Sequence, residues 1–572
     1  MPYRAPVSDY SFLLNHVLDY QQICAQPRFE DAGPDTVDAI LTEAGRMCED
    51  VMAPLQRNGD VQGAVLENGV VRTSPGFAEG YRAIADGGWV STSASVDYGG
   101  MGLPLTVTTA VNEMMASACL SLQLNPLMTQ GQIEALEHHA SDAIKDLYLP
   151  KLITGEWCGT MNLTEPQAGS DVGALRSKAE PNGDGTYAIS GQKIYISWGD
   201  NDFSGNVCHL VLARLPDGVP GTKGISLFLV PKFIPDEQGN PGVANTLKVV
   251  SLEHKMGLHG SPTAVMQYDG ATGWLIGEPH DGMRAMFTMM NNARLGVGGQ
   301  GIGAAEGAFQ HAVAYAQGRV QGRSPIANGG GTIMDHADVR RMLMTMKADI
   351  FAARAIALAN AMAIDMQTAT GAPEWAARAA FLTPITKAFG TDTGIDVASM
   401  GVQVHGGMGF IEETGAAQYL RDVRVTAIYE GTNGIQAMDL VGRKLMDGGD
   451  AAFALLDEMQ GTIEAARAQG SELAEPVWQA IETLREATEW MVEQGNLNDR
   501  FAGAAPFLRA YARVLGGYYH LRASLCDAGQ GARTALARFY IKSLLPEHTG
   551  LIAAACQGAD DLYALTDDDL VA

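Results

Sequence analysis

Side chains that could do chemistry gather in four parts of the chain. These are YGGMGL at 98–103, MNLTEPQAGSDVGALRSKA at 161–179, RLGVGGQGIGAAEGAFQHAVAYAQGRVQGR from 294 onward, and the pair VQVHGGMGF (402–410) and YLRDVRVTAIYEGTNGIQ (419–436). In the second part, Thr164 and Ser170 flank a Pro-Gln-Ala-Gly turn. Hydroxyls and backbone N–H groups of such a turn can converge on the edge and the phosphates of a ligand. The pattern therefore predicts a binding turn.

Because the formal net charge is −26 at pH 7, an anionic ligand can bind only where donor groups are clustered locally. Nucleic-acid binding needs a basic footprint, so no nucleic-acid partner is predicted. An anionic ligand must instead meet glycine-rich turns, helix starts or individual arginines. Arg319 is suited to a pyrophosphate because a guanidinium can donate two parallel charge-assisted hydrogen bonds.

The composition is typical of a soluble globular protein without a metal. Apolar residues make up 46% and charged residues 18% of the chain, and no apolar run approaches the roughly 20 residues that cross a bilayer. The amino terminus has no basic stretch leading into an apolar one and no cleavage site, which predicts a cytoplasmic location without membrane insertion. The seven cysteines are scattered, without C-x-x-C pairs or a histidine cluster, and indicate free thiols.

The first half of the chain changes from helical to strand-like patterning. We expect an aromatic-rich N-terminal extension at 1–35 and a helical domain at 36–157, with an irregular stretch at 87–104. Alternation of apolar and polar residues predicts a hairpin at 186–197, turning around Ser190-Gly191-Gln192, and strands at 207–215, 225–231 and 264–269. A compact antiparallel β domain is therefore predicted at 158–280.

Helical periodicity returns after Gly282. Stretches at 283–321, 335–369, 375–400 and 434–446 predict a four-helix-type bundle at 281–450, with a long connection at 322–332. Residues 451–572 predict an additional helical domain that ends in a frayed, solvated acidic tail. Alternating βαβ units and a G-x-G-x-x-G turn after a strand are missing from the sequence, which argues against a Rossmann domain. The fold class is α+β.

Together, the four parts resemble the acyl-CoA dehydrogenase family over residues 40–446. The YGGMGL turn is weak evidence alone, whereas the string around Ser170 is highly specific. The separations of Arg294 from Arg319 (25 residues) and of Gln403 from Glu430 (27 residues) also match the family. The resemblance implies an N-terminal helical domain, a central β domain and a C-terminal helical bundle, with FAD as the cofactor and an acyl-CoA as the substrate.

The resemblance implies a role for each matching residue, with Glu430 as the catalytic base. FAD contacts are implied for Met161, Leu163, Thr164, Ser170, Tyr195, Ser197, Arg319, Gln321, Gln403, Gly407, Thr432 and Asn433, and substrate contacts for Ser170, Arg294, Tyr429 and Gly431. Many relatives carry Trp in place of Tyr195, and either ring can shield a flavin. Arg319, Gln321, Gln403 and Gly407 would serve the FAD of a neighbouring subunit, which predicts a homodimer or a dimer of dimers.

Oxidation of an acyl-CoA to the trans-2-enoyl-CoA removes a proton from the α-carbon and a hydride from the β-carbon. A carboxylate on the face of the substrate opposite flavin N5 meets this demand. Burial should raise the pKa of Glu430 toward neutrality, and its backbone N–H should help to stabilise the enolate-like charge. Some branches of the family place the base just before the conserved arginine, but that residue is Ala293 here. We interpret Glu165 as a loop-organising carboxylate and His405 as structural.

The N-terminal PYRAPVSDYSFLLNHV and the C-terminal block also resemble the bacterial branch that oxidises 3-methylmercaptopropionyl-CoA during dimethylsulfoniopropionate breakdown. General short- or medium-chain and aryl-substituted acyl-CoAs stay open as substrates. The methionines Met283, Met286, Met289 and Met290 could line an adaptable pocket, although packing favours a role in a helix core. Electron-transfer flavoprotein is the expected electron acceptor.

Three other functions compete with this interpretation. An acyl-CoA oxidase also carries an extra C-terminal helical domain and would form hydrogen peroxide at each turnover. A flavin-free scaffold protein would have no reason to keep Glu430, Arg319, Ser170 and Gln403 together. Relatives that cleave the carbon–sulfur bond of a sulfinylated acyl-CoA lack the usual base, so Glu430 argues against that activity.

Overall fold

The computed structural model describes residues 3–326, 329–527 and 531–572, which fall into two compact units. The first, the sheet unit, is built mainly from Thr42–Ala293. The second, the helical unit, comprises Pro6–Leu41 and Arg294–Ala572. In the described part of the chain, no helix is long and apolar enough to cross a membrane.

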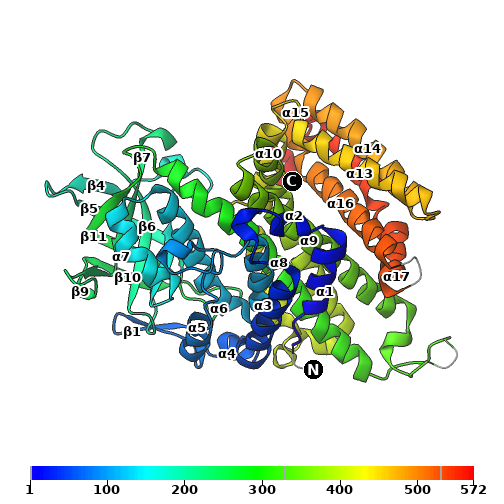
Figure 1. Cartoon of the computed structure of the whole chain (residues 1–572), viewed down its shortest axis with the longest axis horizontal. Helices are drawn as coiled ribbons and strands as arrows, with labels where there is room; N and C mark the ends of the chain where they lie inside the picture. Colours follow the sequence, from blue (N-terminus) through cyan, green and yellow to red (C-terminus); the bar gives the residue numbers. More distant parts are fainter. Residues whose placement is uncertain (1–2, 327–328, 528–530) are drawn as a thin grey trace. The chain divides into compact units, whose positions relative to one another are not determined.

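A seven-stranded sheet is the centre of the sheet unit (Figure 1). Its strands follow the order β10-β11-β5-β4-β6-β3, and β7 pairs with both β11 and β6. The strands are β3 (Trp157–Asn162), β4 (Lys178–Pro181), β5 (Tyr187–Ser197), β6 (Asn206–Arg214), β7 (Ile225–Pro231), β10 (Leu247–Leu252) and β11 (Thr263–Ile276). Two hairpins lie outside this sheet: β1 (Val65–Glu67) with β2 (Val70–Arg72), and β8 (Phe233–Pro235) with β9 (Pro241–Ala244). The apolar run of β6 is buried almost throughout, as expected for a strand covered on both faces.

The hairpin predicted at 186–197 is wrong. Residues 187–197 form the single strand β5, which pairs with β11 along its length. Gly191 has φ +144°, and a Cβ atom there would lie 2.4 Å from the Ser177 hydroxyl oxygen. The glycine therefore permits a close approach of two chain segments, rather than a turn. The sheet is mainly antiparallel as predicted, but β3 runs parallel to β6, which the sequence did not predict.

The sheet unit also contains helices, the longest of which packs on β3. They are α3 (Pro34–Met47), which begins in the helical unit, α4 (Leu55–Val61), α5 (Phe77–Asp86), α6 (Leu105–His139) and α7 (Asp142–Ile153). Helix α6 is buried on nearly all sides, in keeping with its lack of a polar face. Met286 and Met289 lie in the core formed with Ile133, Leu149 and Trp157, so the packing role of the methionine stripe is confirmed. The irregular stretch predicted at 87–104 contains only the short 3-10 helix Val96–Tyr98.

The helical unit contains the predicted bundle and the C-terminal helices. Its helices are α1 (Val7–Phe12), α2 (Gln21–Cys24), α8 (Gly282–Gly318, beginning in the sheet unit), α9 (Ala337–Thr370), α10 (Pro373–His405), α11 (Ala416–Val423), α12 (Asn433–Asp439), α13 (Asp450–Ala468), α14 (Ala474–Glu493), α15 (Leu497–Ala502), α16 (Ala504–Cys526), α17 (Ala532–Phe539), α18 (Glu547–Ala555) and α19 (Asp567–Val571). The predicted connection at 322–332 lies between α8 and α9, and its residues 327–328 are outside the described residues.

Helices α8 and α10 cross with their backbones in close contact at paired glycines. A Cβ atom on Gly298 of α8 would lie 2.8 Å from the Thr386 carbonyl oxygen, and one on Gly390 of α10 would lie 2.7 Å from the Gly298 carbonyl oxygen. Only glycine fits such an approach without displacing the backbone. The crossing fixes the part of α10 around Lys387 against the part of α8 that follows Arg294.

The C-terminal helices pack on one another and on the bundle. Helices α13, α14 and α16, coloured yellow-orange to orange-red in Figure 1, contact each other, and α16 also packs on α9. Arg513 of α16 forms a buried ion pair with Asp349 of α9. The acidic end of the chain is exposed as predicted, but it is not wholly frayed, because Thr566 and Asp569 form a capping box that begins α19.

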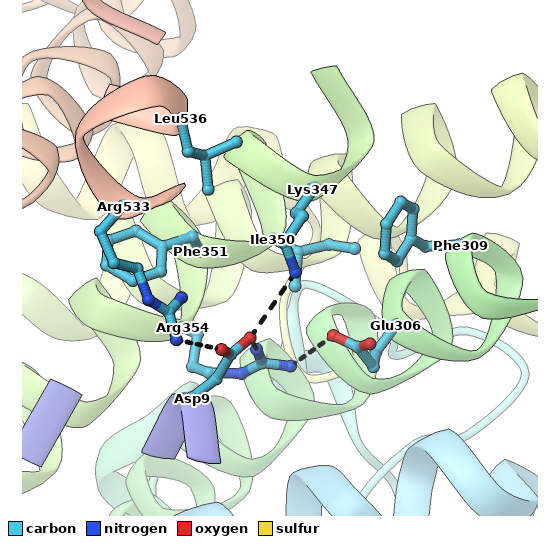
Figure 2. Close-up of a pocket in the computed structure, with 9 residues that line it drawn as sticks. All are labelled: Asp9, Glu306, Phe309, Lys347, Ile350, Phe351, Arg354, Arg533 and Leu536. Atoms are coloured by element: carbon cyan, nitrogen blue, oxygen red, sulfur yellow. Dashed lines mark hydrogen bonds and ion pairs between the residues drawn. The ribbon is translucent and has the colours of Figure 1, made fainter. Parts of the chain in front are cut away.

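A cluster of charged side chains ties α1 into the helical unit (Figure 2). Asp9 of α1 is paired with Arg533 of α17, with Arg354 of α9 at 3.5 Å and with Lys347 at 4.0 Å. Arg354 is 1% exposed and also donates to Glu306 of α8 at 2.8 Å. Burial opposes ionisation of Asp9, but Arg354, Lys347 and Arg533 outweigh it and lower its pKa. One carboxylate thus connects three helices.

Replacing Asp9 by Asn should destabilise the helical unit. Arg533 would lose its charged partner and Arg354 would lose one of its partners while keeping Glu306, and breaking a buried ion pair costs about 3 kcal/mol. Thermal unfolding followed by circular dichroism should show a lower apparent Tm for Asp9→Asn. The matched control is Asp457→Asn, which removes the surface pair with Arg485 and should change the Tm little. Equal Tm values for the two variants would contradict this role of Asp9.

Candidate active site

Glu430 lies in a tight turn of the helical unit between the 3-10 helix Arg424–Ala427 and α12. Its φ is +56°, and that of Gly431 is +84°. A left-handed conformation costs a residue with a Cβ atom about 1 kcal/mol, so the surroundings must hold it in place. Gln436, buried on α12, donates from Nε2 to the Glu430 carbonyl oxygen at 3.2 Å. The strained backbone is thus fixed by a side chain of the following helix.

A second contact anchors the start of this turn. The Tyr429 hydroxyl donates to Gln300 Oε1 of α8, and the Tyr429 N–H donates to the Val425 carbonyl oxygen at 3.1 Å. Gln300 is 1% exposed. Tyr429 is therefore held against α8. This contact restricts the orientation of the next residue, Glu430.

Two cations influence the Glu430 carboxyl group. Burial raises its pKa to about 7, while Arg294 of α8 and Lys387 of α10 counteract that rise. Arg294 is 7% exposed and Lys387 is completely buried. A carboxyl group whose pKa lies near neutrality can accept a proton and give it up again at physiological pH. The catalytic role of Glu430 stays a prediction, and a pKa near 7 is compatible with it.

The structure brings Arg294, Tyr429, Glu430, Gly431, Thr432 and Asn433 together in one region of the helical unit. Thr432 is the N-cap of α12 and accepts from the Ile435 N–H at 3.2 Å. The Asn433 amide contacts α10: its Oδ1 accepts from Lys387 Nζ at 2.9 Å, and its Nδ2 donates to Asp392 Oδ1 at 2.7 Å. The contacts seen for both side chains therefore stabilise the turn.

Arg319, Gln321, Gln403 and Gly407 are exposed and lie away from Glu430 in the helical unit. Arg319 directly follows α8, and a helical rise of 1.5 Å per residue places it about 38 Å from Arg294. Gln403 and Gly407 lie at the carboxyl end of α10. The FAD contacts predicted for these four residues stay predictions.

His405 is a structural residue, as predicted. It is 3% exposed, its Nδ1–H donates to the Gly401 carbonyl oxygen at 2.7 Å, and its ring stacks on His311 at 4.7 Å between centroids. Tyr315 packs against the same ring at 4.4 Å. Burial lowers the pKa of His405, which favours the neutral ring in this aromatic stack.

An accessible edge of the sheet unit carries the remaining predicted residues. Met161, Leu163, Thr164, Ser170, Tyr195 and Ser197 are all at least partly exposed, whereas their neighbours Asn162, Glu165, Lys193 and Ile196 are buried. The Ile194 N–H donates to the Thr164 carbonyl oxygen at 2.9 Å, so the turn after β3 runs beside β5. Tyr195, 61% exposed with φ +61°, displays its ring at this edge.

A buried ion pair organises the turn after β3. Glu165 accepts from Lys193 Nζ at 2.8 Å, from the Ser177 hydroxyl at 2.6 Å and from the Arg176 N–H at 2.7 Å. Burial disfavours its ionisation, but Lys193, Ser177 and the Arg176 N–H lower the Glu165 pKa to about 2. Lys193 also donates to the Leu163 carbonyl oxygen at 3.0 Å. The loop-organising role predicted for Glu165 is confirmed.

Sequence reasoning missed four supporting residues: Gln300, Lys387, Gln436 and Lys193. Two of them carried a signal. Lys387 lies within ITKAF and Lys193 directly precedes the apolar run IYI, and a charge buried beside apolar residues needs a specific partner. The glutamines carried none: Gln300 contacts Tyr429, which is 129 residues away, and Gln436 has no pattern that marks it as the partner of the Glu430 carbonyl oxygen. In the ranges that the structure describes, no group of three or more His, Cys, Asp or Glu side chains could hold a metal ion.

Comparison with known domain families covers most of the chain. The "Acyl-CoA dehydrogenase, N-terminal domain" family matches residues 34–156, the middle-domain family residues 160–271 and the C-terminal-domain family residues 280–446. The family "Acetyl-CoA dehydrogenase C-terminal like" matches residues 455–566. The four matches follow one another along the chain without overlap.

Characterised proteins also resemble the chain over most of their length. A 3-methylmercaptopropionyl-CoA dehydrogenase of Ruegeria pomeroyi is 46% identical, over 91% of this chain and 90% of that protein. A butyryl-CoA dehydrogenase of Syntrophomonas wolfei is 33% identical over 96% of each chain. Among solved structures, butyryl-CoA dehydrogenase from Megasphaera elsdenii is 26% identical, with a TM-score of 0.61 over 72% of this chain and 98% of that one. Caenorhabditis elegans ACDH-11, solved with C11-CoA, shares the fold with a TM-score of 0.78 over 94% and 91%, at 20% identity.

Replacing Glu165 by Gln should loosen the turn after β3. Lys193 would stay buried without a charged acceptor, a loss of about 3 kcal/mol for a broken buried pair. Hydrogen–deuterium exchange should then become faster at the backbone N–H groups of Arg176 and Ser177, which donate to Glu165.

The matched control is Glu180→Gln, on the exposed side of β4. It should leave exchange at residues 163–177 unchanged. If Glu165→Gln exchanged as slowly as the control, Glu165 would not organise this turn.

Proposed function

The chain belongs to the acyl-CoA dehydrogenase family and is an FAD-dependent oxidoreductase, and we propose that Glu430 is its base and 3-methylmercaptopropionyl-CoA its substrate. The observation that carries the role of Glu430 is its placement. One carboxylate stands in a strained turn beside Arg294 and Lys387, with a pKa raised to about 7. Such a group can remove the α-proton of a thioester.

The accessible edge of the sheet unit fits a flavin. It combines the apolar side chains Met161 and Leu163, the ring of Tyr195, and the hydroxyls of Thr164, Ser170 and Ser197. A flat aromatic ring system with polar margins needs this mixture of stacking and hydrogen-bonding groups. We assign FAD contacts to these six residues, and a further contact of Ser170 to the substrate.

FAD, when bound, supplies the acceptor for the hydride that leaves the β-carbon. The chain supplies the other requirements of the reaction. Glu430 accepts the α-proton, and Arg294 helps to keep this carboxyl group ionised until the transfer. The backbone N–H of Glu430 is assigned to the thioester carbonyl, where it would stabilise the enolate-like charge. Tyr429 and Gly431 border the acyl group.

Arg319, Gln321, Gln403 and Gly407 are assigned to the FAD of a partner subunit. Their exposure, and the length of α8 between Arg319 and Arg294, support a ligand other than the one that serves Glu430. Thr432 and Asn433 are assigned to the adenosine side of FAD, where the half-exposed start of α12 offers N–H groups. A homodimer or a dimer of dimers follows, because each site then needs residues of two chains.

The substrate is an acyl-CoA, and the relative of Ruegeria pomeroyi supports 3-methylmercaptopropionyl-CoA within that class. The relative of Syntrophomonas wolfei, similar over nearly its whole length, supports butyryl-CoA as the second candidate. The 3-methylmercaptopropionyl and butyryl groups differ by one thioether sulfur, and a hydrophobic pocket discriminates only weakly between groups that differ so little. Electron-transfer flavoprotein is proposed as the acceptor in a cytoplasmic reaction.

Replacing Glu430 by Gln should abolish dehydrogenation while FAD stays bound. The amide cannot accept the α-proton, and loss of a general base lowers rates by about 100- to 10,000-fold. Anaerobic mixing with 3-methylmercaptopropionyl-CoA or butyryl-CoA should bleach the flavin of the wild type, but not of Glu430→Gln.

Glu413→Gln, in an exposed turn of the same unit, is the matched control and should bleach like the wild type. Bleaching of Glu430→Gln at the wild-type rate would overturn the assignment of the base. A higher kcat/KM for butyryl-CoA than for 3-methylmercaptopropionyl-CoA would overturn only the choice of substrate.

The activity should rise with pH through neutrality. Glu430 must be ionised to accept a proton, and burial raises its pKa to about 7. A plot of kcat/KM against pH should therefore fall on the acid side of about pH 7. An acid limb of the kcat/KM profile near pH 4.5, the ordinary range of a glutamate, would show that burial does not raise the pKa of Glu430.

A further inference from the structure

A lysine is completely buried next to the turn that carries Glu430. Lys387 lies in the middle of α10, is 0% exposed and donates from Nζ to Asn433 Oδ1 at 2.9 Å. A buried ammonium is costly unless acidic groups and hydrogen bonds offset the loss of water. The acidic groups that support its charge are Glu430 first and Asp392 second. The lysine thus faces the proposed base.

We propose that Lys387 is a positioning residue for Glu430: it holds the 429–433 turn through Asn433, and its charge favours the ionised carboxylate. The inference rests on the proposed role of Glu430 and adds a residue to that same site. Lys387 touches neither substrate nor reacting atom in this account. It acts through Asn433 and through its electric field.

The mechanical part of this role is a bridge from α10 to the start of α12. The Asn433 side chain receives the Lys387 ammonium on Oδ1, while its Nδ2 contacts Asp392 Oδ1 at 2.7 Å and Thr391 Oγ1 at 3.0 Å. Because the amide is held on both sides, it cannot rotate freely. Asn433 directly follows Thr432, so the bridge fixes the end of the turn, while Tyr429 fixes its beginning on α8.

The electrostatic part of this role depends on all the charges around Glu430. Arg294 of α8 and Lys387 of α10 favour the carboxylate. Asp439 and Arg443 act on Arg294, and Asp392 acts on Lys387. Burial lowers the Lys387 pKa to about 8, which leaves the lysine mainly charged at pH 7. Without this charge only Arg294 would oppose the effect of burial, and the pKa of Glu430 would rise further.

A purely structural lysine would behave differently from a positioning lysine. Loss of packing or of the Asn433 contact alone would lower activity by the same factor at every pH. Loss of a charge beside the base would instead move the acid limb of the pH profile. The profile therefore separates the two roles.

The test compares Lys387→Met with the wild type and with Lys542→Met, a half-exposed lysine of the C-terminal helices. Each holoenzyme is assayed from pH 5.5 to 9.5 with butyryl-CoA and an artificial electron acceptor, after its FAD content and Tm have been measured. An opposite charge at close range shifts a carboxyl pKa by about one unit or more. The acid limb of Lys387→Met should therefore move up by about one pH unit, with activity at pH 6 falling about tenfold more than at pH 9. Lys542→Met should keep the wild-type profile.

A second variant covers the case in which Lys387→Met does not fold. Asn433→Asp has nearly the same shape, and its carboxylate would neutralise the lysine charge in place, so its acid limb should also move to higher pH. An unmoved limb in the variant that folds, with or without a uniform loss of activity, would overturn the inference. That result would leave Glu430 as the base if Glu430→Gln fails to bleach the flavin, so the two proposals can fail separately.

Discussion

The close crossing of α8 and α10 is the constraint on which the rest of the site depends. Gly298 and Gly390 let the two backbones meet, and each helix then contributes one cation and one hydrogen-bonding anchor to the turn at Glu430. Arg294 and Gln300 come from α8, and Lys387 and Asp392 come from α10. A bulkier residue at the crossing would separate the helices, and the left-handed Glu430 would lose the contacts that hold it.

In the sheet unit, a different buried ion pair holds an irregular turn in place. The turn after β3 has little regular structure, yet it must present several side chains at one edge. Glu165 and Lys193 hold its inner side, so Leu163, Thr164 and Ser170 remain outside. Both units thus use a buried lysine beneath an irregular segment. A buried charge needs its partner at one position, because separating the pair is costly. Such a pair therefore fixes a loop more firmly than apolar contacts, which persist when the loop shifts slightly.

The residues proposed for the site were easier to predict from the sequence than the residues that hold them in place. Glu165 and the limits of β7 follow from local patterns, and the structure agrees with them, whereas the role of Glu430 stays a proposal. The supports depend on contacts between distant segments, such as Tyr429 with Gln300 and Asn433 with Lys387, which one sequence does not encode visibly. The wrong prediction of a hairpin at 186–197 also comes from a contact between separate segments. Ser190-Gly191-Gln192 resembles a turn locally, but the close approach of Ser177 from a neighbouring segment requires a glycine inside the continuous strand.

The most direct test of the account is to follow the α-proton itself. The substrate analogue 3,3-dimethylbutyryl-CoA has no hydrogen on its β-carbon and cannot be oxidised, but its α-hydrogens can still exchange with deuterated water. The account predicts exchange catalysed by the wild-type holoenzyme and near-background exchange with Glu430→Gln. Equal exchange by the two proteins would contradict it, because a group other than Glu430 would then be removing the proton.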